Sequence, residues 1–138
     1  MKEINYMNTQ IIIESLKPID VPFIVHKHNP RSGSSHFDIR FVDNKNPKLL
    51  HSFAAPSNFL ETKDKKIVLA KTRDHDIRWL TLKSYRLDVI DKGQVTINIS
   101  TNKYFELVFH GKVLNGKYKL FKMHNTSRED RWLLVKSK

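Results

Sequence analysis

Strict alternation of polar and apolar residues over positions 35–41, Ser-His-Phe-Asp-Ile-Arg-Phe, restricts the fold of this chain more than any other feature. Successive side chains of a β-strand point to opposite faces of the sheet. The alternation therefore predicts a strand that places its three apolar side chains in the core. It also predicts that His36, Asp38 and Arg40 share the opposite face, where their polar groups lie in one row.

A second strand is expected just upstream, over residues 23–28. It ends with two imidazoles, His26 and His28, which lie on one face because they are two positions apart. An imidazole, a carboxylate and a guanidinium in one row can hold a metal ion and a phosphate together. The two segments together therefore predict a catalytic metal site.

Short segments of β type recur along the rest of the chain, separated by residues that favour turns. The chain shows no internal repeat and no sustained helical periodicity, although short helices are expected near residues 57–61 and 76–84. Many short strands at such spacing favour a β-barrel or a β-sandwich. Of these we expect a mainly β fold, a compact single-domain β-barrel of short, mostly antiparallel strands with one or two short helices. The strands are expected at residues 23–28, 36–42, 49–54, 67–71, 86–90, 95–100, 104–110, 117–123 and 132–136.

Domain limits and strand connections are also expected from turn residues. Residues 1–18 are expected to form an N-terminal arm or an early strand, and residues 19–138 the barrel domain. Asn115-Gly116 lies between two alternating segments and predicts a tight hairpin, because a type I′ turn needs positive φ at both central residues. Asp91-Lys92-Gly93 is expected to separate two further strands.

The charge of the chain favours a polyanionic partner. Its 25 Lys and Arg residues exceed its 14 Asp and Glu residues, which gives a formal net charge of +11. Such an excess favours nucleic acid first and an anionic membrane surface second. A generic basic surface is the alternative explanation.

The absence of cysteine limits the kinds of site that the chain can form. Without cysteine there is neither a disulfide nor a thiolate-bound zinc, so any metal must be held by nitrogen and oxygen ligands. The longest apolar run near the N-terminus, residues 11–13, is too short for a signal peptide or a membrane span. We expect a soluble, cytoplasmic protein that does not bind a membrane.

Six motifs follow one another in the order typical of one enzyme family. The chain resembles the 3′-phosphoesterase domain of bacterial DNA ligase D and its free-standing archaeal relatives, from about residue 22 to the C-terminus. The matching segments are residues 23–28 with His36-Phe37-Asp38-Ile39-Arg40, then Ser52-Phe53-Ala54-Ala55-Pro56, Asp74-His75, Val89-Ile90-Asp91-Lys92-Gly93, residues 109–118 and residues 131–136.

The resemblance implies a β-barrel that carries a manganese-dependent enzyme for healing DNA or RNA 3′ ends. Family members remove a terminal ribonucleoside and then the remaining 3′-phosphate, which leaves a 3′-OH. The resemblance also implies that His28, His36 and Asp38 are the metal ligands and that Arg40 and His75 contact the scissile phosphate. The implied partners are DNA or RNA–DNA 3′ ends, together with a DNA ligase or polymerase of the same repair pathway.

The chemistry of these residue types agrees with the implied roles. Two imidazoles and one carboxylate leave coordination positions open for water and substrate, as a catalytic metal requires. A mixed nitrogen and oxygen set suits Mn²⁺, and it also accepts Zn²⁺ or Fe²⁺. Arg40 lies two residues along the same face from Asp38, where a guanidinium can bind phosphate oxygens bidentately. His75 can stabilise developing charge or protonate the leaving oxygen.

The chain departs from the family pattern at several positions. Ser57 stands where the family often has a Lys, Trp79 stands where it has a Tyr, and the N-terminal residues needed for nucleoside removal have no counterpart. These departures favour the phosphatase step over nucleoside removal. They also motivate a second hypothesis, a catalytically degenerate module that binds nucleic-acid ends or a repair partner. A metal-dependent phosphodiesterase for another substrate, such as a cyclic phosphate, is a third.

The connection between the two histidine-bearing strands raises one further alternative. Residues 29–35 form a longer loop than the family has, which can displace His28 from the metal. His26 is then a candidate substitute, because it shares a strand face with His28. The favoured interpretation of His26 is an ordinary strand histidine.

Overall fold

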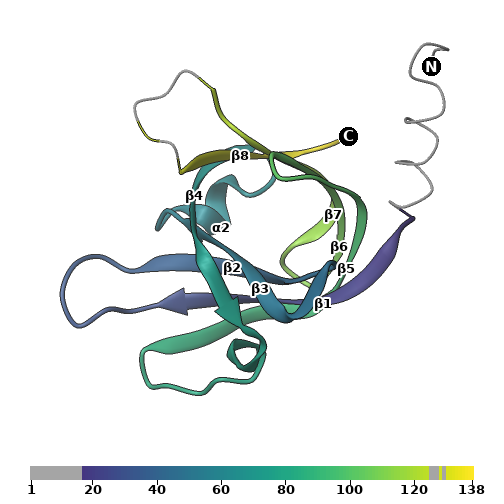
Figure 1. Cartoon of the computed structure of the whole chain (residues 1–138). Helices are drawn as coiled ribbons and strands as arrows, with labels where there is room; N and C mark the ends of the chain where they lie inside the picture. Colours follow the sequence, from purple (N-terminus) through teal and green to yellow (C-terminus); the bar gives the residue numbers. More distant parts are fainter. Residues whose placement is uncertain (1–16, 125–127, 129) are drawn as a thin grey trace, which may run out of the picture.

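In the computed structural model, which describes residues 17–124, 128 and 130–138, eight antiparallel strands close into a barrel (Figure 1). Around the barrel the order is β1-β2-β3-β4-β8-β7-β6-β5, so most neighbours follow one another in the chain. The expected mainly β barrel is confirmed. The strands are β1 (Ile19–His28), β2 (His36–Asp43), β3 (Asn46–Ala55), β4 (Lys66–Asp76), β5 (Leu87–Ser100), β6 (Tyr104–His110), β7 (Asn115–Lys122) and β8 (Arg131–Lys136).

The described residues contain one short helix and one 3₁₀ turn. The helix α2 (Phe59–Thr62) lies where a helix was expected near residues 57–61, and the buried ring of Phe59 lies 5.3 Å from that of Phe37. The second expected helix is limited to the 3₁₀ turn η1 (Ile77–Leu80). The arm or early strand expected over residues 1–18 falls mainly on residues 1–16, which lie outside the described residues.

The barrel interior is filled by the alternate, inward-facing residues of the strands. Phe37, Ile39 and Phe41 of β2 are all buried there, as the alternation predicted. The ring of Phe41 packs edge-on against Phe105, with 5.3 Å between centroids, and Phe105 lies 5.9 Å from Trp132. This aromatic core fixes which face of β2 points outward, and so fixes the face that carries the polar row.

The turn-forming residues Asp91-Lys92-Gly93 lie inside one continuous strand, so the prediction that they separate two strands was wrong. The strand β5 bends there instead of ending. Val25 of β1 pairs with Asp91 whereas His26 pairs with Val89, so one residue of β5 forms a β-bulge. A bulge bends a strand and increases its twist, which lets a long strand follow the wall of a small barrel.

A hairpin joins β6 and β7, but its turn is not the expected Asn115-Gly116. Asn115 pairs with His110 and Gly116 with Phe109, so both residues belong to β7, where Gly116 has φ +112°. The connection is the four-residue loop 111–114, which the buried carboxylate of Asp91 holds in place. This carboxylate accepts hydrogen bonds from the backbone N–H groups of Lys112 (3.0 Å), Val113 (3.0 Å) and Leu114 (2.7 Å).

Gly111 opens this loop, and we expect Gly111→Ala to lower the free energy of unfolding by about 2 kcal/mol. A Cβ at this position would overlap Asp91 Oδ2 and would lie 2.7 Å from Phe23 Cζ. Urea unfolding followed by circular dichroism measures the loss. Lys112→Ala is the matched control, because Lys112 is exposed in the same loop and should change stability by less than about 0.5 kcal/mol. Equal effects of the two substitutions would contradict this account of the loop.

The 3₁₀ turn η1 covers part of the outer face of the barrel by packing against β1 and β3. Its residues Ile77, Trp79 and Leu80 are partly buried there. Trp79 covers Arg40, which is only 4 % exposed although it faces away from the barrel interior. Asp38, on the same face and beside Arg40, is 6 % exposed. These buried polar side chains therefore lie outside the barrel wall, separate from the apolar core.

Candidate metal centre

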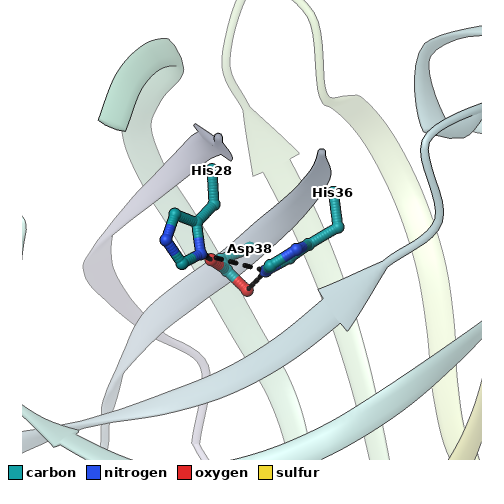
Figure 2. Close-up of side chains that lie close together, drawn as sticks. All are labelled: His28, His36 and Asp38. Carbon is teal, nitrogen blue, oxygen red and sulfur yellow. Dashed lines mark hydrogen bonds and ion pairs between the residues drawn. The ribbon is translucent and has the colours of Figure 1, made fainter. Parts of the chain in front are cut away.

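The three expected ligands converge at one end of the β1–β2 pair (Figure 2). His28 is the last residue of β1 and lies directly opposite His36, the first residue of β2. Asp38 is two positions further along β2, on the same outward face. The antiparallel register therefore keeps His28 beside His36 despite the long connecting loop 29–35.

Two of the three distances between the ligand atoms match those of a metal-binding set, and the third is slightly longer. His28 Nδ1 lies 3.2 Å from His36 Nε2 and 3.8 Å from Asp38 Oδ2, and His36 Nε2 lies 3.4 Å from Asp38 Oδ1. Ligands at about 2.1 Å from a metal ion lie about 3.0–3.4 Å apart when they subtend angles between about 90° and 109°. The donor types and spacing therefore fit a divalent transition metal with positions left for water or substrate.

Arg40 lies next to this ligand set and is held on three sides. Its Nη2 is 3.4 Å from Asp38 Oδ2, and its Nη1 donates a hydrogen bond of 2.9 Å to His26 Nδ1. Its guanidinium carbon lies 4.6 Å from the centroid of the Trp79 ring. A guanidinium fixed in this way is oriented before any ligand binds.

His26 is fully buried and serves Arg40 rather than the metal ligand set. Because Arg40 donates to Nδ1, that nitrogen carries a lone pair and the proton of the neutral ring lies on Nε2. Burial, reinforced by the charge of Arg40, lowers the pKa of His26 to about 4. Both ring nitrogens are therefore unsuited to binding the metal. The hydrogen bond between His26 and Arg40 was not predicted from the sequence. The alternation of side chains along β1, which places His26 on the polar face near Arg40, could have indicated it.

His75 lies near the end of β4. Its Nδ1 donates a hydrogen bond of 2.9 Å to the carbonyl oxygen of Arg73, and its ring packs edge-on against Trp79 with 4.7 Å between centroids. Burial, together with the nearby charge of Arg40, lowers the pKa of His75. The hydrogen bond at Nδ1 leaves Nε2 as the nitrogen that can reach a ligand.

All five expected site residues line one pocket of about 420 Å³ on the outer face of the barrel. Among the described residues that line it, one carboxylate, Asp38, is outnumbered by three guanidinium groups, so the pocket favours an anion. These guanidinium groups belong to Arg40, Arg73 and Arg86. The lining residues are His28, His36, Asp38, Arg40, Thr72, Arg73, His75, Trp79, Leu82, Ser84, Arg86 and Leu87.

A second group of possible metal ligands, Asp43, His51 and Asp74, lies elsewhere on the barrel. His51 Nε2 is 3.6 Å from Asp43 and His51 Nδ1 is 3.8 Å from Asp74, so the two carboxylates face different nitrogens of the ring. Lys71 already forms an ion pair of 3.0 Å with Asp74. Because a metal ion would have to compete with Lys71 for the carboxylate of Asp74, this group is the weaker candidate.

A larger hollow of about 520 Å³ lies between β3, β4, β8 and α2, but its lining is mostly small or apolar. The five predicted metal-binding and phosphate-binding side chains lie instead in the smaller pocket.

Within the described part of the chain, no helix is both long and apolar enough to cross a membrane. No protein-family model matches this chain, and no curated protein matches it either.

Proposed function

We propose that this protein is a metal-dependent 3′-phosphoesterase that removes phosphate from the 3′ ends of nucleic acids in the cytoplasm. The product of that reaction is a 3′-OH, the group that a DNA ligase or polymerase needs. The observation that carries the proposal is the position of a three-ligand set beside a preoriented guanidinium and an imidazole in one pocket. The net charge of +11 adds support, because it favours a polyanionic substrate.

The proposed hydrolysis breaks the bond between phosphorus and the 3′ oxygen of the sugar. His28, His36 and Asp38 would hold Mn²⁺, which when bound polarises the phosphoryl oxygens and lowers the pKa of a coordinated water. The oxygen of water attacks phosphorus, and the 3′ oxygen leaves and takes up a proton. The products are inorganic phosphate and a 3′-OH end.

Arg40 and His75 have separate tasks in this proposal. Arg40 keeps positive charge next to the phosphoryl group, where charge increases in the transition state. His75 is neutral before substrate binds, because its pKa is lowered. A bound phosphate favours the protonated ring, and Nε2–H can then donate a proton to the leaving oxygen.

The test is phosphate release from a primer–template that ends in a 3′-phosphate, with added Mn²⁺, with Zn²⁺ and with EDTA. We expect release with a divalent transition metal, none after chelation, and little from the same duplex phosphorylated at its 5′ end. Release that survives EDTA would contradict the metal-dependent mechanism. An absence of release with every metal would contradict the enzyme proposal.

A second candidate, a binding module without turnover, is favoured by the burial of Arg40. The guanidinium is only 4 % exposed, is covered by Trp79, and already contacts Asp38 and His26. A phosphate must displace part of this cover to reach it. Tight binding of the 3′-phosphate duplex without release, measured by fluorescence anisotropy, would support the binding module.

A further inference from the structure

We propose that Tyr85 is the stacking platform for the base of the terminal nucleotide and so helps to determine substrate specificity. The inference rests on the proposed function and deepens it. It identifies the group that would hold the nucleoside while the phosphate lies beside Arg40 and the metal ligands.

Tyr85 is 85 % exposed, the most exposed large apolar or aromatic side chain of the described residues. Leu82 and Val89 in the same segment are 38 % and 53 % exposed. Single exposed apolar side chains are normal on a protein surface, but an exposed aromatic ring beside a polar pocket is typical of a binding surface. We therefore consider a functional role for Tyr85.

The backbone holds Tyr85 at the rim of the candidate metal centre. Its neighbours Ser84 and Arg86 both line the pocket. A hydrogen bond of 3.0 Å from Leu87 N to the Ser84 carbonyl closes a turn around Tyr85. Another, of 2.8 Å from Asn29 N to the Arg86 carbonyl, joins this turn to the residue that follows His28. Tyr85 is thus tied to the strand end that provides the first candidate ligand.

The ring of Tyr85 is oriented by the side chain of Arg86. Arg86 Nε and Nη2 donate hydrogen bonds of 3.0 and 2.7 Å to the Tyr85 hydroxyl, and the guanidinium carbon lies 5.0 Å from the ring centroid. An aromatic side chain has few rotatable bonds and therefore loses little entropy when it binds a partner. Arg86 also brings positive charge next to the ring, where a nucleic-acid backbone would pass.

The combination of an aromatic ring with an anion-binding pocket fits a nucleotide. Arg40, Arg73 and Arg86 provide positive charge for phosphate, and an aromatic ring provides a surface for the planar base. Trp79 is the weaker candidate for that surface, because its ring is partly buried and packs against Arg40 and His75. Tyr85 is 85 % exposed, although Arg86 lies near its ring. Base–aromatic stacking depends little on sequence, so we expect the four terminal bases to be accepted within a few-fold.

The experiment is a double-mutant cycle in which removal of the Tyr85 ring from the protein is combined with removal of the terminal base from the substrate. The substrates are two 3′-phosphorylated oligonucleotides that differ only in having a terminal base or an abasic terminal sugar. We expect Tyr85→Ala to lower kcat/KM about 10-fold on the first and less than about 2-fold on the second. Tyr85→Phe should retain activity, since it keeps the ring and loses only the two hydrogen bonds that Arg86 donates to the hydroxyl. Leu60→Ala, an exposed residue of α2 outside the pocket, is the control.

Two results would overturn the inference. Equal losses for Tyr85→Ala on the two substrates would show that the ring does not meet the base. A loss for Tyr85→Phe as large as that for Tyr85→Ala would show that the residue only positions Arg86. If the wild-type protein releases no phosphate, the proposed enzyme function fails separately. The same cycle is then measured as dissociation constants of the two oligonucleotides, and the same criteria apply.

Discussion

Replacing His36 with alanine is expected to lower metal-dependent phosphate release at least about 10³-fold while the barrel stays folded. His36 Nε2 is close to both other ligands, at 3.2 Å from His28 Nδ1 and 3.4 Å from Asp38 Oδ1. Its side chain is partly exposed on the outer face, so its loss leaves no cavity in the aromatic core. The expected defect is therefore confined to the metal centre.

Calorimetry with Mn²⁺ separates loss of the metal from loss of the fold in this variant. We expect heat of binding for the wild-type protein and for His124→Ala, an exposed histidine outside the pocket, but not for His36→Ala. Circular dichroism should give the same spectrum for all three proteins. Full activity or unchanged Mn²⁺ affinity in a folded His36→Ala protein would remove His36 from the proposed ligand set.

The strands could be predicted from the sequence because they are strongly patterned, although this pattern fits a β-sandwich as well as the closed barrel. The alternation at Phe37, Ile39 and Phe41 reports directly which face is buried, since strand side chains alternate strictly. His28 and His36 are the two residues that flank the connecting loop 29–35. Once the strands form an antiparallel hairpin, these two residues therefore lie opposite each other. Strand alternation and hairpin register therefore suffice to predict that the three candidate ligands lie together, whereas their role in metal binding is a proposal.

The turns could not be predicted in the same way, because long-range contacts decide them. Asn115-Gly116 has the local preference for a tight turn, but the carboxylate of Asp91 fixes the loop 111–114 through three backbone N–H groups. Asp91 itself lies in a strand that the sequence predicted to end there. The link between His26 and Arg40 was missed for a related reason, since it depends on the side chains that η1 buries on the outer face.

Arg40→Lys is expected to reduce kcat about 10²-fold, even though it keeps the positive charge. The guanidinium of Arg40 has enough donors to contact Asp38 and His26 and still offer one to a phosphate, whereas an ammonium group is a single point charge. Lysine also loses the flat contact with Trp79 that orients the side chain. Arg78→Lys is the matched control, because Arg78 is exposed, pairs with Asp76 and lies outside the pocket.

The Mn²⁺ affinity of the Arg40→Lys protein decides between two roles for the arginine. If Arg40 contacts the phosphate, kcat falls and the dissociation constant for Mn²⁺ changes little, because the three ligands stay in place. If Arg40 only orients Asp38, Mn²⁺ binds more weakly and saturating Mn²⁺ restores kcat. Restored activity would therefore contradict the phosphate contact and leave Arg40 as a positioning residue. A persistent loss at saturating Mn²⁺ is the expected result, because the proposed phosphate contact needs the guanidinium donors that a lysine side chain lacks.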